Sequence, residues 1–237
     1  TAVIEYRQSR GWLVGDENAG LHAMFTMMNN ARLGVGIEGL SQCELATQKA
    51  LEFARNRKQG HAKIDNRKGV ILDHPDVRRM LITMKSLTAA VRALCLDAAL
   101  SLDLSKSNDK QTASKENARA SFLIPIAKAF STDIGCRVAD IGIQVHGGMG
   151  YVEETGAAQV FRDVRVTAIY EGTNGIQAID LIGRKLADNG KAANGLIDEI
   201  KITISNCSNH EDQQIREMGN RLSKSLVCLE STLNWML

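Results

Sequence analysis

The sequence feature that most constrains the fold is a series of long segments in which apolar residues recur with the period of an α-helix. The clearest segment carries one unbroken apolar stripe over about twenty residues: Val77, Met80, Leu81, Met84, Leu87, Val91, Leu94 and Ala98. Only two of the 237 residues are proline, so little interrupts such helices. We therefore expect an all-α chain whose helices pack as an antiparallel helical bundle.

Helical periodicity also predicts a helix on each side of this stripe. The first starts near Asp16, where acidic and amide side chains favour a helix start, and runs to about Gly60. Its early face carries Leu21, Met24, Phe25 and Met28. The helix after the stripe carries Leu123, Ala127, Phe130, Ile134, Val138, Ile141 and Val145. Pro125 is expected in its first turn, because deeper inside it would break the hydrogen-bond ladder.

Shorter helices and polar loops are expected in the rest of the chain. One short helix is predicted around residues 154–164, and two helices are predicted after residue 195. Another helix follows Gly175, and its apolar face is formed by Ile176, Ile179, Ile182 and Leu186. Polar composition predicts three loops, at residues 61–72, 105–117 and 187–195.

The first 16 residues have a different character from the rest. They contain two short β-prone runs, AVIEY and GWLV, separated by RQSRG. Such runs predict the last strands of a preceding β-rich domain. The chain begins at Thr1 without a methionine and stops at Leu237 inside a helical pattern. We therefore expect it to be a piece of a longer protein.

Composition argues against several classes of function. The formal net charge is +2, whereas binding of nucleic acid requires a concentrated basic face, so no nucleic-acid partner is expected. No apolar run reaches the roughly 18 residues that a membrane span requires, so no integral membrane segment is expected. The five cysteines are dispersed along the chain, as are the five histidines. This dispersal predicts reduced thiols, as in a cytoplasmic protein, and no metal site.

Three glycines in the first helix match a dinucleotide-binding pattern. Gly34, Gly36 and Gly39 fit G-x-G-x-x-G. That pattern holds a pyrophosphate only where it follows a strand and opens a helix. The residues before Gly34 have helical period instead. We therefore predict that these glycines allow two helices to pack closely, and that they form no dinucleotide site.

The clearest chemical signal lies in residues 139–184, which read ADIGIQVHGGMGYVEETGAAQVFRDVRVTAIYEGTNGIQAIDLIGR. This stretch and two segments before it resemble the acyl-CoA dehydrogenase family. The resemblance extends over nearly all of residues 1–190 and is carried by five motifs: NNARLGVG at 29–36, ARNRKQG at 54–60, QVHGGMG at 144–150, FRD at 161–163 and YEGTNGIQ at 170–177.

The resemblance implies a subunit with a helical N-terminal domain, a β middle domain and a C-terminal helical bundle. Residues 1–16 would end the middle domain, residues 17–190 would form the bundle, and residues 191–237 would begin the extra helical region of longer members. FAD would be the cofactor, an acyl-CoA the substrate and electron transfer flavoprotein the partner. A homodimer or homotetramer is implied, in the bacterial cytoplasm (preferred) or the mitochondrial matrix. A separated piece would be inactive.

The resemblance also assigns a catalytic role to Glu171. In the family, a glutamate removes the α-proton of the thioester while the β-hydrogen leaves as hydride, which yields the trans-2-enoyl-CoA. Such a base must lie within hydrogen-bond reach of the proton. Ile169 and Tyr170 would shield Glu171 from water and make it a stronger base. Gly172 has no Cβ and would let the acyl chain and the flavin approach closely.

Further site residues follow from the matching motifs. The implied cofactor-binding residues are Arg57, Gln144, Gly147, Gly148, Thr173, Asn174 and Gly175, of which the first four would face the FAD of a neighbouring subunit. The implied substrate-binding residues are Asn29, Arg32, Tyr170 and Gly172. Structural roles remain open for several of them: a helix-capping turn at Gly147, a helix N-cap at Thr173 and a salt bridge at Arg32. His146 is predicted to be structural.

Two other functions fit the same sequence. An acyl-CoA oxidase of the same fold would pass the electrons to oxygen, and Glu171 does not distinguish it from a dehydrogenase. A helical oligomerisation module without catalysis is the alternative from a different class. The retention of glutamate within YEGT counts against this second alternative.

Overall fold

A computed structural model describes residues 2–60 and 69–237; the side chains of His22, Phe25 and Thr26 also lie outside the described set. The described part of the chain forms helices joined by short turns and contains no β-strand. The all-α fold is therefore confirmed. No helix in the described ranges is long and apolar enough to cross a membrane.

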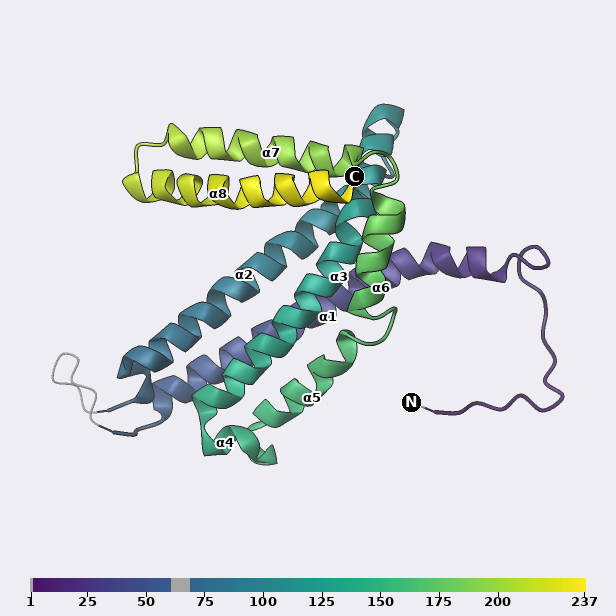
Figure 1. Cartoon of the computed structure of the whole chain (residues 1–237). Coiled ribbons are helices and arrows are strands. Elements are labelled where there is room, and N and C mark those ends of the chain that lie inside the picture. The colour runs from purple at the N-terminus through teal and green to yellow at the C-terminus, as the bar shows by residue number, and fades with distance from the viewer. Residues whose placement is uncertain (1, 61–68) are drawn as a thin grey trace.

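Four helices form the bundle: α1 (Gly20–Asn56), α2 (Pro75–Leu104), α3 (Lys110–His146) and α5 (Ala157–Thr167). Successive helices run in opposite directions, as Figure 1 shows. Contacts agree with this, because α1 meets Ala127 of α3 at Gly36 and Ser131 of α3 at Gly39, so these two helices are parallel. Helix α2 lies beside both and runs back between their ends. The predicted antiparallel bundle is confirmed.

Small and apolar residues fill the centre of the bundle. The predicted stripe of α2 faces this core at Met80, Leu81, Met84 and Val91, all of which are buried. The surrounding helices contribute Cys43, Ala46, Ala50, Ala54, Val138, Ala139, Val160 and Val164. Short side chains on α1 let the helices approach closely, so the helix period read from the sequence also identifies the buried faces.

The glycine pattern in α1 is a packing feature, as predicted, for two of its three glycines. A Cβ at Gly39 would lie 2.7 Å from the backbone oxygen of Ser131, and one at Gly36 would lie 3.4 Å from that of Ala127. Gly34 has no atom within 4 Å of such a Cβ. The α1–α3 contact therefore requires glycine at 39, whereas a Cβ at 36 would make an ordinary van der Waals contact.

The prediction of a loop at 105–117 is wrong for its second half, since α3 begins at Lys110. Asp109 caps this helix, and its side chain accepts a hydrogen bond from the Thr112 N–H at 3.0 Å. Pro125 lies inside α3 and is fully buried, so its predicted position in the first turn is also wrong. Tertiary packing of the helix outweighs the loss of one backbone bond at proline.

Three other expectations about the loops and termini require correction. The β-strands expected in the first 16 residues are not seen: the described residues 2–14 are exposed and have no strand partner for their backbone groups. The last predicted loop ends early, because α7 (Lys191–Ser208) begins within it. Of the loop expected at 61–72, residues 61–68 lie outside the described residues, and Ile71–Asp73 form a short 3₁₀ turn, η1.

The remaining helices extend the bundle at its two ends. After α3 come α4 (Gly148–Tyr151) and the 3₁₀ turn η2 (Glu153–Thr155), and the short helix expected around 154–164 is α5, which begins at Ala157. Helix α6 (Asn174–Asp180) continues as a π-helical turn, η3 (Leu181–Lys185). The antiparallel pair α7 and α8 (Gln213–Met236) crosses the far end of the bundle (Figure 1). It packs there through a second core that includes Leu123, Leu186, Ile197, Leu226 and Leu233.

Candidate active site

The segment between α5 and α6 carries Glu171 in a strained backbone conformation. The φ angle is +53° at Glu171 and +83° at Gly172, so both residues are left-handed. Glycine adopts this region freely, but a residue with a Cβ loses roughly 1–2 kcal/mol. The surrounding structure must therefore hold Glu171 in place, a combination that is often found at functional sites.

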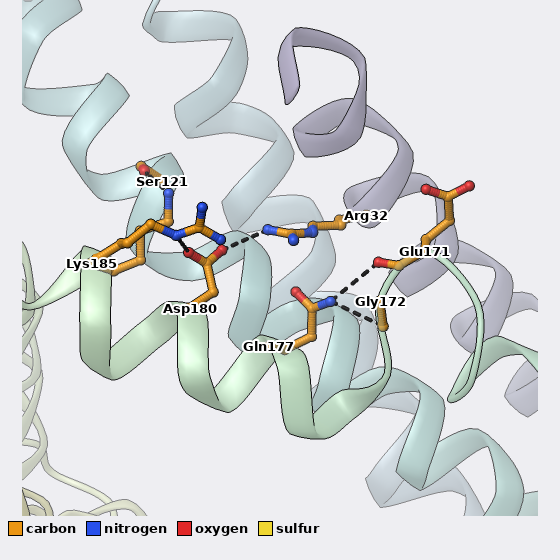
Figure 2. Close-up of polar contacts among 8 residues, drawn as sticks. Arg32, Ser121, Glu171, Gly172, Gln177, Asp180 and Lys185 are labelled. Carbon is orange, nitrogen blue, oxygen red and sulfur yellow. Dashed lines mark hydrogen bonds and ion pairs between the residues drawn. The ribbon is translucent and has the colours of Figure 1, made fainter. Parts of the chain in front are cut away.

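Two buried side chains hold the carbonyl groups of this turn. Gln177 donates through Nε2 to the oxygens of Glu171 and Gly172, at 3.3 and 3.1 Å. Lys128, on α3, donates through Nζ to the Gly172 oxygen at 2.9 Å and to Asn174 Oδ1 at 3.0 Å. Figure 2 shows the two Gln177 bonds and the carboxylate of Glu171, which points away from them. The turn thus directs its carbonyls inward and its carboxylate outward.

The residues after the turn start α6 and attach it to α3. Thr173 is the N-cap, and its hydroxyl accepts the Ile176 N–H at 3.3 Å, so the predicted capping role is confirmed. Asn174 donates to Thr132 Oγ1 at 3.0 Å and to Asp133 Oδ1 at 2.7 Å. The Asn174 side chain is therefore used against α3. Of the three residues expected to contact FAD here, Thr173 and Gly175 are the exposed ones.

A buried ion pair lies behind the same turn. Arg32 Nη1 of α1 is 2.6 Å from Asp180 Oδ2 of α6, and their side chains are only 4 % and 1 % exposed. Arg184 also bonds Asp180, and Lys185 donates to Ser121 Oγ at 2.8 Å on the far side of this cluster (Figure 2). The salt bridge considered for Arg32 is therefore present, although it is buried. Arg32 is not exposed for direct contact with a substrate within this chain.

The apolar residues before Glu171 lie at the surface of this chain. Ile169 is 52 % exposed and Tyr170 is 37 % exposed, while Glu171 is half-buried, so the shielding of Glu171 by these two residues stays a prediction. The Tyr170 hydroxyl donates to a carboxylate oxygen of Glu38 on α1. Burial raises the pKa of Tyr170 to about 12, and the hydrogen bond to Glu38 adds to this shift. Tyr170 is therefore a neutral phenol held at the edge of the site.

Asn29 is the remaining residue expected at the substrate side. It lies on α1, one turn before Arg32, and is exposed. Because Arg32 lies behind the Glu171 turn, the exposed face of α1 near Asn29 adjoins the same end of the bundle. The four expected substrate residues thus comprise two exposed side chains, one buried arginine and Gly172 in the turn.

The other expected cofactor residues gather at the opposite end of the bundle. Arg57 follows the last turn of α1, and Gln144, Gly147 and Gly148 lie where α3 ends. The rings of Phe53 and His146 pack at 4.5 Å and bring these two helix ends together. Gln144 is about 18 Å from Thr132 along α3, at 1.5 Å per residue. The Glu171 turn and this second group therefore cannot contact the same small ligand group.

The second group is open to solvent. Arg57, Gln144, Gly147 and Gly148 are exposed, and the Arg57 side chain makes no ion pair with another described residue. His146 is buried and its Nδ1 lies 2.7 Å from the Gly142 oxygen, so the structural role predicted for it is confirmed. Gly147 has φ of +60° and ends α3, as the capping interpretation expects.

Sequence reasoning did not find Lys128, Gln177, Asp180 or Glu38. Helix α6 shows why, since its apolar residues Ile176 and Ile179 are exposed while Gln177 and Asp180 are buried. An apolar stripe normally indicates the buried face of a helix. A signal was present for Lys128, which lies inside the apolar stripe of α3, where a buried lysine requires partners.

Comparison with known proteins identifies the class. Residues 18–187 match the family model described as "Acyl-CoA dehydrogenase, C-terminal domain". The whole chain is 41 % identical over 240 residues to 3-methylmercaptopropionyl-CoA dehydrogenase of Ruegeria pomeroyi. A butyryl-CoA dehydrogenase of Syntrophomonas wolfei is 38 % identical over 185 residues, which is 74 % of this chain. The chain belongs to the acyl-CoA dehydrogenase family and corresponds to its C-terminal domain.

Solved structures agree with this fold. Butyryl-CoA dehydrogenase from Megasphaera elsdenii superposes with a TM-score of 0.59 at 28 % identity, over 71 % of this chain and 39 % of that one. Caenorhabditis elegans ACDH-11 in complex with C11-CoA gives a TM-score of 0.72 at 23 % identity over 94 % of this chain and 34 % of that one, which shows a shared fold. The chain spans only 41 % and 30 % of the lengths of the two bacterial relatives.

Proposed function

We propose that the whole protein is an FAD-dependent acyl-CoA dehydrogenase that converts an acyl-CoA thioester to the trans-2-enoyl-CoA. The observation that carries this proposal is the held left-handed turn, which presents the Glu171 carboxylate outward from the bundle. Family membership supplies the reaction class. The two bacterial relatives named above are called 3-methylmercaptopropionyl-CoA dehydrogenase and butyryl-CoA dehydrogenase.

Glu171 is the proton acceptor in this proposal. Its carboxylate takes the proton from the α-carbon, and the electron pair of that C–H bond becomes the new α,β double bond as a hydride leaves the β-carbon. FAD, when bound, supplies the acceptor for that hydride. The Glu171 carboxylate makes no ion pair or hydrogen bond with another described residue, so it is free to reach the substrate. The Tyr170 phenol lies beside it and would line the acyl side.

The exposed donors of this chain fit the chemistry of FAD. Arg57 is a cation without an ion pair among the described residues, and Gln144 offers an amide beside two glycines at the end of α3. A guanidinium suits a pyrophosphate, and an amide suits a sugar or base. Thr173 and Gly175 would contact FAD at the Glu171 end. Asn174 would contribute mainly by fixing the turn, since its side chain bonds α3.

The separation of these two groups supports an oligomer. We infer that Arg57, Gln144, Gly147 and Gly148 contact the FAD of a neighbouring copy, in a homodimer or homotetramer, because they lie at the other end of the bundle: Gln144 is about 18 Å along α3 from Thr132, which bonds Asn174 beside the Glu171 turn. Electron transfer flavoprotein is the proposed acceptor of the electrons.

The cysteines bear on the compartment. All five cysteines are free, which supports a reducing compartment and hence the cytoplasm.

We also infer the division of the chain. Residues 1–16 end the middle domain, residues 17–190 form the C-terminal bundle, and residues 191–237 begin an extra helical region. The family match ends at residue 187, and α7 begins at Lys191, which supports the second boundary. The part described here carries the base without most of the cofactor walls, so it is expected to be inactive when separated.

The proposal is tested by mixing the full-length flavoprotein anaerobically with acyl-CoAs of graded chain length. Bleaching of the flavin by at least one acyl-CoA is expected, and the best substrate gives the chain-length class. The absence of bleaching by every thioester would refute the proposal and favour an oligomerisation module. If oxygen, and not electron transfer flavoprotein, rapidly reoxidises the reduced flavin, the protein is an acyl-CoA oxidase.

A further inference from the structure

Two buried polar side chains around the Glu171 turn have no role in the function proposed so far. Lys128 is 0 % exposed and Gln177 is 1 % exposed. Burial of an amine or an amide without partners costs several kcal/mol, so each position must be stabilised by its hydrogen bonds. Both side chains direct those bonds to the backbone oxygens of the turn.

The hydrogen bonds from Lys128 and Gln177 determine how the peptide groups of the Glu171 turn are oriented. A trans peptide places its N–H on the side opposite its C=O. Because the oxygens of Glu171 and Gly172 accept from Gln177, the N–H groups of Gly172 and Thr173 point away from Gln177. The Glu171 carboxylate also points away from Gln177 (Figure 2). The inward pull also compensates for the left-handed φ of +53° at Glu171. Without it, an ordinary extended or helical conformation of Glu171 would be favoured.

The amine of Lys128 is placed to act on the turn alone. Its partners are the Gly172 oxygen and Asn174 Oδ1, and both belong to the segment that follows Glu171. Burial lowers the pKa of Lys128, while the nearby carboxylate of Asp133 opposes the shift. The Nε2 group of Gln177 makes the other two bonds, and its Oε1 is buried without a hydrogen-bond partner among the described residues. The Gln177 side-chain amide is therefore held in place by its two hydrogen bonds to the Glu171 turn.

We propose that Lys128 and Gln177 are positioning residues for Glu171: they hold the two carbonyls of the turn inward and so keep the Glu171 carboxylate aligned for proton abstraction. This inference rests on the proposed function for the identity of the base. A base displaced by about 1 Å can lose roughly 10²-fold in rate. Loss of Lys128 or Gln177 should slow proton abstraction and leave substrate binding nearly unchanged, because neither side chain reaches the outer face of the turn.

The experiment compares Lys128→Met and Gln177→Met in the full-length holoprotein. Lys185→Met is the matched control, because Lys185 is a half-buried lysine that donates to α3 through Ser121 Oγ, yet it makes no bond to the turn. The limiting rate of flavin reduction should fall about 10–100-fold in the first two variants, with acyl-CoA affinity changed less than threefold. The control should stay within about twofold of the parent.

Two further readouts separate positioning from general damage to the fold. Hydrogen–deuterium exchange of the peptide 168–176 should quicken by about tenfold or more in Lys128→Met and Gln177→Met, with the 157–167 peptide of α5 unchanged. In a Glu171→Gln background, Lys128→Met should slow the residual reaction by less than about threefold, because positioning has no value without the base. Additive losses would overturn the proposal.

The outcomes also distinguish this inference from the proposed function. If Glu171→Gln reduces flavin at the parent rate, the proposed base is wrong. If Glu171→Gln is inactive while Lys128→Met and Gln177→Met keep the parent rate and exchange, the positioning proposal alone is wrong. Should Lys128→Met fail to fold, Gln177→Met gives the same comparison, since it removes only an amide with two bonds to the turn.

Discussion

The backbone contact between α1 and α3 at Gly39 gives a sharp test of how the fold is built. Gly39→Ala introduces a Cβ that would lie 2.7 Å from the Ser131 oxygen and 2.9 Å from its carbonyl carbon. Both atoms are backbone, so no side chain can rotate away and α1 must move from α3. Overpacking of this kind costs about 3 kcal/mol at the upper end of its usual range. Alanine in a helix recovers about 1 kcal/mol, which leaves a net loss of about 2 kcal/mol.

Gly34→Ala is the matched control for this substitution. Gly34 lies in the same helix and the same glycine pattern, but no atom lies within 4 Å of its added Cβ. Alanine there should raise the free energy of unfolding by up to about 1 kcal/mol through helix propensity alone. Urea unfolding followed by circular dichroism at 222 nm measures both variants against the parent. Equal stability of the two variants would refute the packing interpretation of the pattern.

Two further predictions concern buried polar groups and thiols. Asp180→Asn should destabilise the protein by about 3–5 kcal/mol, because it leaves the buried Arg32 uncompensated. Arg32→Met should cost less, because Arg184 still pairs with Asp180. The double variant should recover a large part of the Asp180→Asn loss; additive losses in the melts would contradict a direct pair. Burial raises the pKa of the Cys43 thiol to about 12, so only a fraction of ~10⁻⁴ of the thiol is ionised at pH 8. The rate of its alkylation by iodoacetamide should therefore rise about tenfold per pH unit. Mass spectrometry should find the exposed Cys228 modified first, and early labelling of Cys43 would contradict the buried core.

Helical period predicts most of this fold because most helices here bury their apolar face within the chain. The stripe of α2 is buried as its spacing indicates. The start of α3 was missed because residues 110–117 are polar on all sides, so their helix is stabilised by the Asp109 cap and by continuation of the helix, which periodicity does not report. Pro125 was misplaced for a related reason, since packing along the rest of α3 tolerates one missing bond.

The candidate site shows a different limit of sequence reasoning. Motif order located Glu171 and the two groups around it, but periodicity assigned the wrong face of α6. Its apolar residues, such as Ile179, are exposed, while Asp180 is buried against Arg32. Apolar patterning shows that a helix face is hydrophobic, but it does not show whether that face packs within the same chain or against another surface. The inward bonds of Lys128 and Gln177 depend on backbone geometry at Glu171, which only the structure provides.

The measurement that tests the central claim most directly is flavin reduction by an acyl-CoA in Glu171→Gln of the full-length protein. Glutamine keeps the size of the side chain but cannot accept a proton at working pH, so the α-carbon stays protonated and no hydride leaves. The limiting rate should fall by at least about 10²–10⁴-fold with FAD still bound. Glu154→Gln is the control, because Glu154 is exposed in the turn before α5 and should reduce at the parent rate. Reduction of the Glu171→Gln flavin at the parent rate would show that the base lies elsewhere.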